Sequence, residues 1–132
     1  MDELIKAYTE TDFKVYEPLI VIKVGQINKA LDDLLTAKNY TTWAYITAWN
    51  PYSEMTRNEL NEERNLQLFE DIKSYLVFEG EGVGTDPNWQ AEKSFLILGI
   101  DRHSAILLGK KYRQNAIVVG VIQQPAELVW VK

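Results

Sequence analysis

The chain has 132 residues, of which 46% are hydrophobic, and this is the size and composition of one globular domain with its own core. It contains no cysteine, which excludes disulfides, thiolate catalysis and cysteine-based zinc sites. The net charge of −5 argues against non-specific nucleic-acid binding, and no apolar run has the length of a membrane span, so we expect a soluble cytoplasmic protein with no membrane partner.

Hydrophobic periodicity and turn residues divide the chain into alternating strands and helices. The predicted elements, in chain order, are one or two helical turns over 2–9, strands over 13–16 and 19–24, a helix over 26–38, a strand over 42–49, a helix over 56–75, strands over 76–78 and 93–100, a short helix from Asp101 or Ser104 to Tyr112, and strands over 116–122 and 127–131. The order, ββ-α-β-α-ββ-α-ββ, predicts an α+β domain spanning 1–132. Its single mixed sheet should have about five to six strands, with three main helices packed on it.

Capping residues set two of these helix boundaries. Asn39 is expected to end the helix over 26–38 in the left-handed conformation. Thr56 and Glu59 have the spacing of a capping box, so Thr56, or Ser53 before it, should cap the helix over 56–75. The core side of that helix is predicted to carry Leu60, Leu68, Phe69, Ile72 and Tyr75.

The strand over 42–49 places small side chains on one face and bulky ones on the other. Its small face, with Ala44, Ile46 and Ala48, suits close packing of a helix. Pro51 cannot donate to a central ladder, so the strand ends at Asn50. The Asn50 amide either pins this turn or orients a ligand at the strand end.

Two polar residues occupy the core side of the helix that follows. Asn61 and Arg64 share the stripe that later carries Leu68, so both should face the interior just beyond a strand end. A guanidinium there binds an anionic group through two parallel hydrogen bonds, pairs with an acid such as Glu81 or Glu92, or keeps its head in water. The first alternative predicts an anion-binding site.

An acidic, glycine-rich loop precedes the strand over 93–100. Glu81, Asp86 and Glu92 either hold a divalent cation, act as acid and base, or only keep the loop hydrated around a Trp89 that covers the core. The alternating glycines at 80, 82 and 84 match no phosphate-binding motif, and they indicate a strand with a bulge or a close backbone contact.

Polar residues also follow the last predicted helix. Gln114 and Asn115 either cap the carbonyl groups at the helix end or reach a ligand beside Asn50. His103, in the first turn of that helix, has no evident partner and is expected at the surface.

Four segments in a fixed order resemble the mostly bacterial family catalogued as domain of unknown function 3293. They are Ile46-Thr47-Ala48-Trp49-Asn50-Pro51, then Glu59-Leu60-Asn61 with Arg64, then Trp89 with Glu92 to Phe95, and finally Gln114-Asn115-Ala116. The resemblance runs from about residue 13 to 131 and implies a small stand-alone α/β domain without implying an activity. One departure is Arg113, where the resemblance leads us to expect a glycine.

The first functional hypothesis is a small-molecule site at the strand ends. Its predicted ligand-binding residues, which the resemblance also marks, are Asn50, Asn61, Arg64, Trp89, Ser94, Gln114 and Asn115. Glu92 is the candidate catalytic acid or base, and Arg64 would bind the charged group of a small anionic metabolite. The sequence indicates no metal site by its spacing and names no cofactor.

Two alternatives belong to other functional classes. In one, the protein is a non-catalytic interaction module whose closing strand over 127–131 pairs with a partner or with a second copy, giving a homodimer. In the other, the cluster of Arg102, Lys110, Lys111 and Arg113 contacts nucleic acid, although a solvated helix face explains the same cluster.

Overall fold

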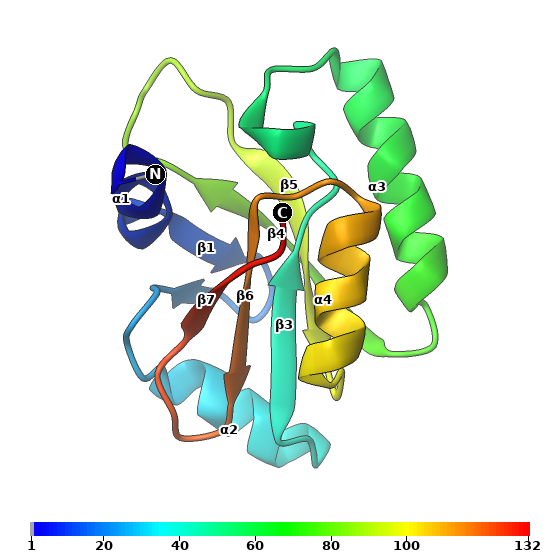
Figure 1. Cartoon of the computed structure of the whole chain (residues 1–132). Helices are drawn as coiled ribbons and strands as arrows, with labels where there is room; N and C mark the ends of the chain where they lie inside the picture. Colours follow the sequence, from blue (N-terminus) through cyan, green and yellow to red (C-terminus); the bar gives the residue numbers. More distant parts are fainter. Residues whose placement is uncertain (1) are drawn as a thin grey trace.

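The computed structural model describes residues 2–132, and over these residues it shows one seven-stranded sheet and four helices (Figure 1). The helices are α1 (Asp2–Glu10), α2 (Lys29–Lys38), α3 (Asn58–Ile72) and α4 (Arg102–Lys111), with a 3₁₀ turn, η1 (Pro51–Ser53), before α3. The strands are β1 (Asp12–Val15), β2 (Ile20–Ile22), β3 (Thr42–Ile46), β4 (Leu76–Val83), β5 (Glu92–Leu98), β6 (Ala116–Val121) and β7 (Glu127–Trp130). The α+β class is confirmed, whereas the expected strand and helix counts were too low.

The strands are arranged in the order β2-β1-β4-β5-β3-β6-β7, and each neighbouring pair is antiparallel. The prediction of a mixed sheet was therefore wrong. Strand–helix–strand alternation favours parallel neighbours, but here the two strands that a helix joins are never adjacent. For example, α4 leads from β5 to β6, and β3 lies between them.

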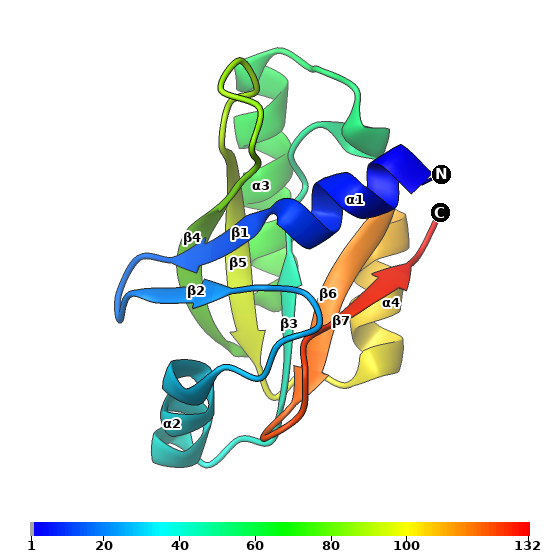
Figure 2. The same ribbon diagram turned by 90° about the vertical axis from the view of Figure 1, so that its left-hand side faces the viewer.

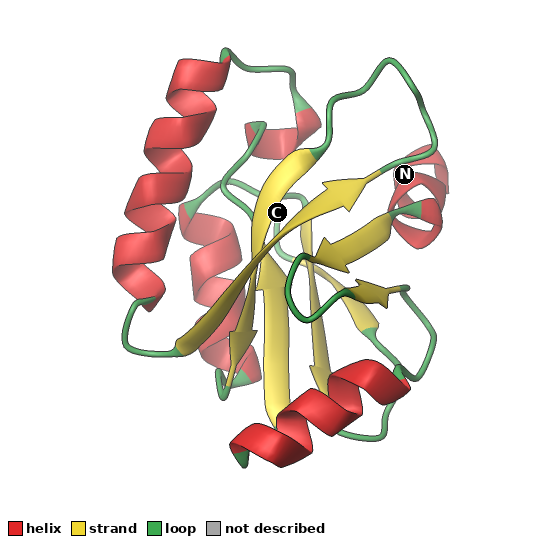
Figure 3. Cartoon of the chain, turned by 180° about the vertical axis from the view of Figure 1, so that it is seen from behind, coloured by secondary structure: helices red, strands yellow, loops and turns green. Residues whose placement is uncertain are grey.

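The sheet curls until its two edges meet. Val24, just after β2, forms a bridge with Ala126, just before β7. The Gly25 N–H donates to the Ala126 carbonyl at 2.8 Å, and the Ala126 N–H donates to the Gln26 carbonyl at 3.1 Å. Figures 2 and 3 show the result, an incomplete barrel with α2 at one end and α1 across the other.

The two faces of the curled sheet carry separate cores. Inside the curl, side chains from strands at both ends of the sheet pack together, and Leu31 and Leu35 of α2 close one end. On the outside, α3 and α4 cover the sheet. The small face of β3 belongs to this outer core, as predicted: Ala44, Ile46 and Ala48 pack with Leu68 and Ile72.

The end of α2 agrees with the prediction, whereas the start of α2 and the capping of α3 differ from it. Asn39 ends α2 with φ 63°, as expected, but the helix begins at Lys29 because the Asn28 side chain accepts from the Leu31 N–H. Thr56 does not cap α3, because it precedes the N-cap residue and its Oγ1 donates to the Glu54 carbonyl at 3.1 Å. No side chain caps α3 at its N-cap residue, Arg57.

Two further expectations about α3 and β4 need correction. Phe69 of α3 is 41% exposed instead of buried. Strand β4 extends to Val83, well past the predicted segment 76–78. The predicted close backbone contact is confirmed, because a Cβ at Gly80 would lie 1.8 Å from the carbonyl oxygen of Lys14 on β1.

No helix within residues 2–132 combines the length and the apolar character that crossing a membrane requires.

Candidate functional site

Helix α1 crosses one end of the incomplete barrel (Figure 2). Residues of α1 and of the sheet line a cavity of about 360 Å³ there, called the mouth cavity below. Helix α1 supplies one wall through Leu4, Ala7 and Tyr8. The inner face of the sheet supplies the floor through Phe13, Tyr45, Thr47, Gly82, Glu92, Ser94, Ala116 and Val118. Ile117 also borders the cavity, although its side chain belongs to the outer core. Ser53 of η1, the β4–β5 loop from Gly84 to Trp89, and Gln114 complete the lining.

Strand alternation explains why polar groups reach this cavity. In β5 the even-numbered residues face the inside of the curl, where Leu96 and Leu98 belong to the inner core. Glu92 and Ser94 therefore point into the mouth cavity, whereas Lys93 points outward and binds Glu62 at 2.6 Å. Gly82 of β4, which pairs with Glu92, leaves the cavity open because it has no side chain to fill it.

The Glu92 carboxyl group is held by two donors on one oxygen. Its Oε2 accepts from the Trp89 indole N–H at 3.0 Å and from the Asn50 side-chain amide at 3.1 Å. Burial raises the pKa of Glu92 above its usual value, and these two hydrogen bonds offset only part of the rise. A carboxyl group with a raised pKa in a cavity is a candidate acid or base.

Asn50 and Asn61 form the support behind this carboxyl group. The Asn61 Oδ1 accepts from the Asn50 N–H at 2.9 Å, and the Asn61 amide donates to the Asn50 Oδ1 at 2.9 Å. Both residues are buried, and neither lines the mouth cavity. Asn50 thus pins the turn, which was one of the two alternatives for its role, and its side chain also orients Glu92.

The turn after β3 has an unusual backbone. Asn50, Tyr52 and Ser53 have φ of 45°, 54° and 61°, in the left-handed region that residues other than glycine rarely adopt. The Tyr52 N–H donates to the Arg113 carbonyl at 2.7 Å, and the Asn115 amide donates to the Ser53 Oγ at 2.9 Å. These contacts hold Ser53 at the cavity wall in a conformation that costs free energy.

Tyr8 of α1 contributes a hydroxyl group to the wall of the mouth cavity near Ser53. Burial raises the pKa of this hydroxyl; hydrogen bonding with Ser53 opposes the rise, and the charge of Glu92 adds to it. The ring packs edge to face against Trp130, with 5.9 Å between the ring centroids. Tyr8 therefore connects α1, η1 and the edge strand β7 around the cavity.

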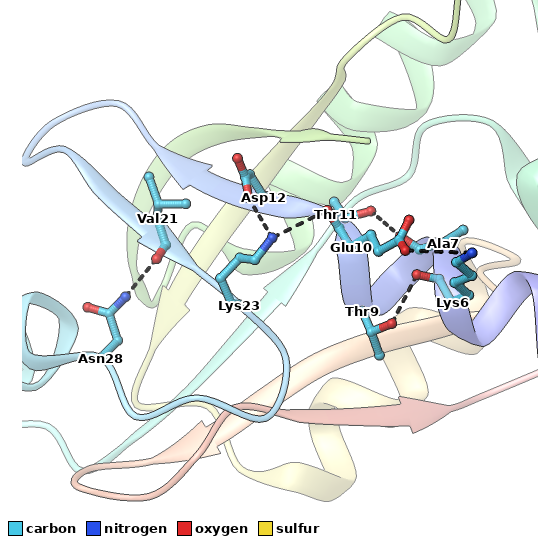
Figure 4. A network of polar contacts seen from close by, with 9 residues as sticks. All are labelled: Lys6, Ala7, Thr9, Glu10, Thr11, Asp12, Val21, Lys23 and Asn28. Atoms are coloured by element: carbon cyan, nitrogen blue, oxygen red, sulfur yellow. Dashed lines mark hydrogen bonds and ion pairs between the residues drawn. The ribbon is translucent and has the colours of Figure 1, made fainter. Parts of the chain in front are cut away.

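The C-terminal end of α1 is fixed by the polar network in Figure 4. The Lys23 Nζ donates to the Glu10 carbonyl at 3.3 Å and to the Asp12 Oδ1 at 2.8 Å. The Thr11 Oγ1 donates to the Ala7 carbonyl at 2.6 Å. These bonds satisfy carbonyl groups that a helix end leaves free, and they fix the wall of the cavity to β1 and β2.

Gln114 and Asn115 both contact this region. The Gln114 amide donates to the Tyr112 carbonyl at 3.2 Å and to the Trp49 carbonyl at 3.3 Å, and Gln114 also lines the mouth cavity. Gln114 therefore caps the end of α4, which was one of the two alternatives, while Asn115 acts through Ser53.

Arg64 is separate from the mouth cavity. It lies on α3 and does not line the mouth cavity. It also does not line a second cavity, on the outer face of the sheet, that Glu62, Phe69 and Lys93 border. It forms no ion pair within residues 2–132. Its Nη1 is buried and has no hydrogen-bond partner among these residues. The alternative of an ion pair with Glu81 or Glu92 is therefore wrong for this part of the chain, and Glu81 instead accepts from Tyr16 at 2.7 Å.

The remaining polar clusters are explained without a ligand. Glu81, Asp86 and Glu92 do not gather into a metal-binding group in the range 2–132. In the basic cluster, Arg102 makes two 2.8 Å bonds to Glu127, and Lys111 binds Asp71 at 2.7 Å. His103 is exposed, as expected.

The sequence analysis missed four residues of this region: Tyr8, Thr47, Ser53 and Asn65. The Asn65 Oδ1 accepts from the Ala48 N–H at 2.9 Å, and its amide donates to the Lys93 carbonyl at 2.9 Å, so it ties the ends of β3 and β5 together. Its position four residues after Asn61 places it on the same helix face, and that spacing was an available signal. No local pattern marks Tyr8, because α1 approaches β3 only through the curl of the sheet.

Comparison with known proteins gives one match. A family model described as "Protein of unknown function (DUF3293)" matches residues 46–117. No significant match is found among the curated proteins or the solved structures. The matched region holds all eight predicted site residues together with Thr47 and Ser53, while the α1 wall lies outside it. Because the match covers more than half of the chain, the protein belongs to the DUF3293 family.

Proposed function

We propose that the mouth cavity binds a small organic molecule and that Glu92 is the polar group that recognises it. The observation that carries this proposal is a buried carboxyl group, oriented by Trp89 and Asn50, on the floor of a cavity lined mostly by apolar and aromatic side chains. The cavity volume of about 360 Å³ falls within the range of roughly 300–1,000 Å³ that is common for ligand pockets.

The hydrogen bonds of Glu92 leave one oxygen for a ligand. Both donors reach Oε2, and Oε1 accepts no hydrogen bond from residues 2–132. Because Trp89 and Asn50 fix the plane of the carboxyl group, Oε1 is held ready before any ligand arrives. Tyr8 and Ser53 add hydroxyl groups on the opposite wall.

The test is a screen of small aromatic fragments by NMR, with the indole N–H of Trp89 as the reporter. This resonance is assigned by its loss in Trp89→Phe. We expect fragments to shift it, because the indole donates to the carboxyl group that would bind them. A screen in which no fragment shifts this resonance would contradict the proposal.

A cavity-filling variant provides the control for location. Gly82→Leu adds a side chain inside the mouth cavity, and a Cβ at this position meets only the Phe13 and Thr11 side chains, at 3.8 Å. Glu79→Leu adds the same side chain on the opposite face of β4, where Glu79 is exposed. Fragment binding should be lost in Gly82→Leu and kept in Glu79→Leu.

A further inference from the structure

We infer that the ligand carries a protonated amine, an inference that rests on the proposed function of the mouth cavity. The charged residues that line this cavity are Glu92 on the floor and Asp86 at the rim, and both are acidic. Among the described residues no lysine, arginine or histidine lines it. An anionic group would therefore meet only like charge, whereas a cation would be attracted.

Four cationic residues are next to cavity residues in the sequence: Lys6, Lys14, Lys93 and Arg113. Lys6 is exposed and lies 3.9 Å from Glu10 of the same helix. Lys14 alternates on β1 with Phe13 and Val15 of the inner core, so its side chain is on the outer face of the sheet. Lys93 lies between Glu92 and Ser94 in the sequence, but its side chain is on the outer face of the sheet with Glu62. Arg113, next to Gln114, is exposed. The negative potential at the floor is thus not cancelled from within the cavity wall.

Aromatic side chains beside Glu92 suit a cation as well. Tyr8, Phe13 and Trp89 line the cavity, and the faces of such rings attract ammonium groups. The Trp89 ring is held by its bond to Glu92, and the Tyr8 ring by its contact with Trp130. The pairing of a fixed carboxylate with fixed rings is the arrangement that recognises an amine with an apolar body.

Ligand charge and the ionisation of Glu92 are coupled. Burial raises the pKa of Glu92, so part of the free protein carries a neutral carboxyl group when the pH lies near that pKa. A bound ammonium group favours the ionised form and should displace the proton. Amine affinity is therefore expected to increase as the pH rises through this pKa, while the amine itself stays protonated.

The experiment uses three probes of matched shape and different charge: phenethylamine, 2-phenylethanol and phenylacetate. Titration with the Trp89 indole resonance as readout should show phenethylamine binding at least about tenfold more tightly than the other two, as expected for a charge-assisted hydrogen bond. Glu92→Gln should remove this preference, because the amide group does not carry the charge. Glu63→Gln removes one exposed acid on α3 and should leave all three affinities unchanged.

Two results would overturn the inference. Equal or tighter binding of 2-phenylethanol or phenylacetate would show that the site does not select a cation, and the proposed binding function would stand. Absence of any shift with all three probes would also refute selection of an amine. The binding function itself would fall only if the wider fragment screen were negative too.

Discussion

At the scale of single residues, Glu92 lies on the floor of the mouth cavity at a cost in stability. Its carboxyl group is buried, and the two donors on Oε2 do not fully compensate the lost hydration, so its pKa is raised. A group whose pKa is higher in the folded than in the unfolded state stabilises the fold at low pH, and this contribution is lost as the pH rises through the folded-state pKa.

Glu92→Gln should therefore make the protein more stable than the wild type at neutral pH and above. The amide oxygen still accepts from Trp89 and Asn50, and the variant has no charge to bury. The difference in the free energy of unfolding should shrink as the pH falls through the raised pKa of Glu92 and should reach its minimum below the ordinary pKa of a glutamate. Urea denaturation over a series of pH values measures it, and a difference that grows toward low pH would contradict the assigned shift.

Arg113 offers a second test at this scale. Its φ is 55°, a conformation that glycine adopts without strain, and the resemblance to the family leads to the expectation of a glycine at this position. The tight turn is therefore present although the residue is arginine. Arg113→Gly should raise the free energy of unfolding by up to about 1 kcal/mol, since relief of the strain is partly offset by the flexibility of glycine in the unfolded chain.

Arg113→Ala is the matched control, because it removes the same charge and keeps the Cβ. Chemical denaturation of both variants should show a gain for glycine alone. An equal gain for alanine would mean that the charge of Arg113, and not its backbone conformation, limits stability.

At the scale of elements, α1 is the part of the site that depends on the fewest anchors. Its C-terminal end is held by Lys23 (Figure 4). Its middle is held by the contact of Tyr8 with Trp130. We predict that Lys23→Met increases amide hydrogen exchange in α1 while lowering global stability by less than about 1 kcal/mol, because the ion pair with Asp12 is partly exposed.

Lys29→Met is the control for this prediction. It removes a lysine that is paired with Asp33 on α2 and has no bond to α1. Exchange in α1 should remain as in the wild type. Equal acceleration of exchange in both variants would show that Lys23 does not anchor the helix.

The elements also show how far the sequence determines the fold. Strands such as β3 and β5 and helix α2 follow from local periodicity and capping, and they were predicted correctly in type and order. The length of β4 was predicted too short, because Gly80 and Gly82 carry no side chains that could show the alternation of a strand. Its pairing with β1 provides the hydrogen bonds that extend it.

Local sequence patterns identified some of the residues that line the mouth cavity, but not its relation to Arg64. Glu92, Ser94, Trp89 and Gln114 were identified from polar residues at strand and helix ends, and all four line the mouth cavity. The place of Arg64 relative to the cavity depends on how α3 packs against the sheet, which no local spacing encodes.

At the scale of the whole molecule, the bridge between Val24 and Ala126 keeps the sheet curled and so defines the inner core. The double variant Val24→Cys and Ala126→Cys should form a disulfide in this otherwise cysteine-free chain. Closing a loop of about 100 residues should stabilise the fold by roughly 2–4 kcal/mol in the oxidised form. Thermal unfolding with and without reductant measures the effect.

Each single cysteine variant serves as a control. The unfolding temperature of either variant, as a monomer, should be the same with and without reductant. If the double variant stays reduced under oxidising conditions, the two edges of the sheet are not adjacent in solution.

Fragment binding in the oxidised double variant should match the wild type, since neither residue lines the mouth cavity.

The closure of the sheet has a consequence for synthesis on the ribosome. The strand pair β1–β2 emerges early, yet the backbone groups that join its edge to the other side belong to Ala126. Until that late segment has left the exit tunnel, the inner faces of β1 and β2 lack their final partners and expose apolar side chains to water. A nascent chain of this kind should need protection by a chaperone, and its folding should be slow for its length because its decisive contacts join distant parts of the polypeptide.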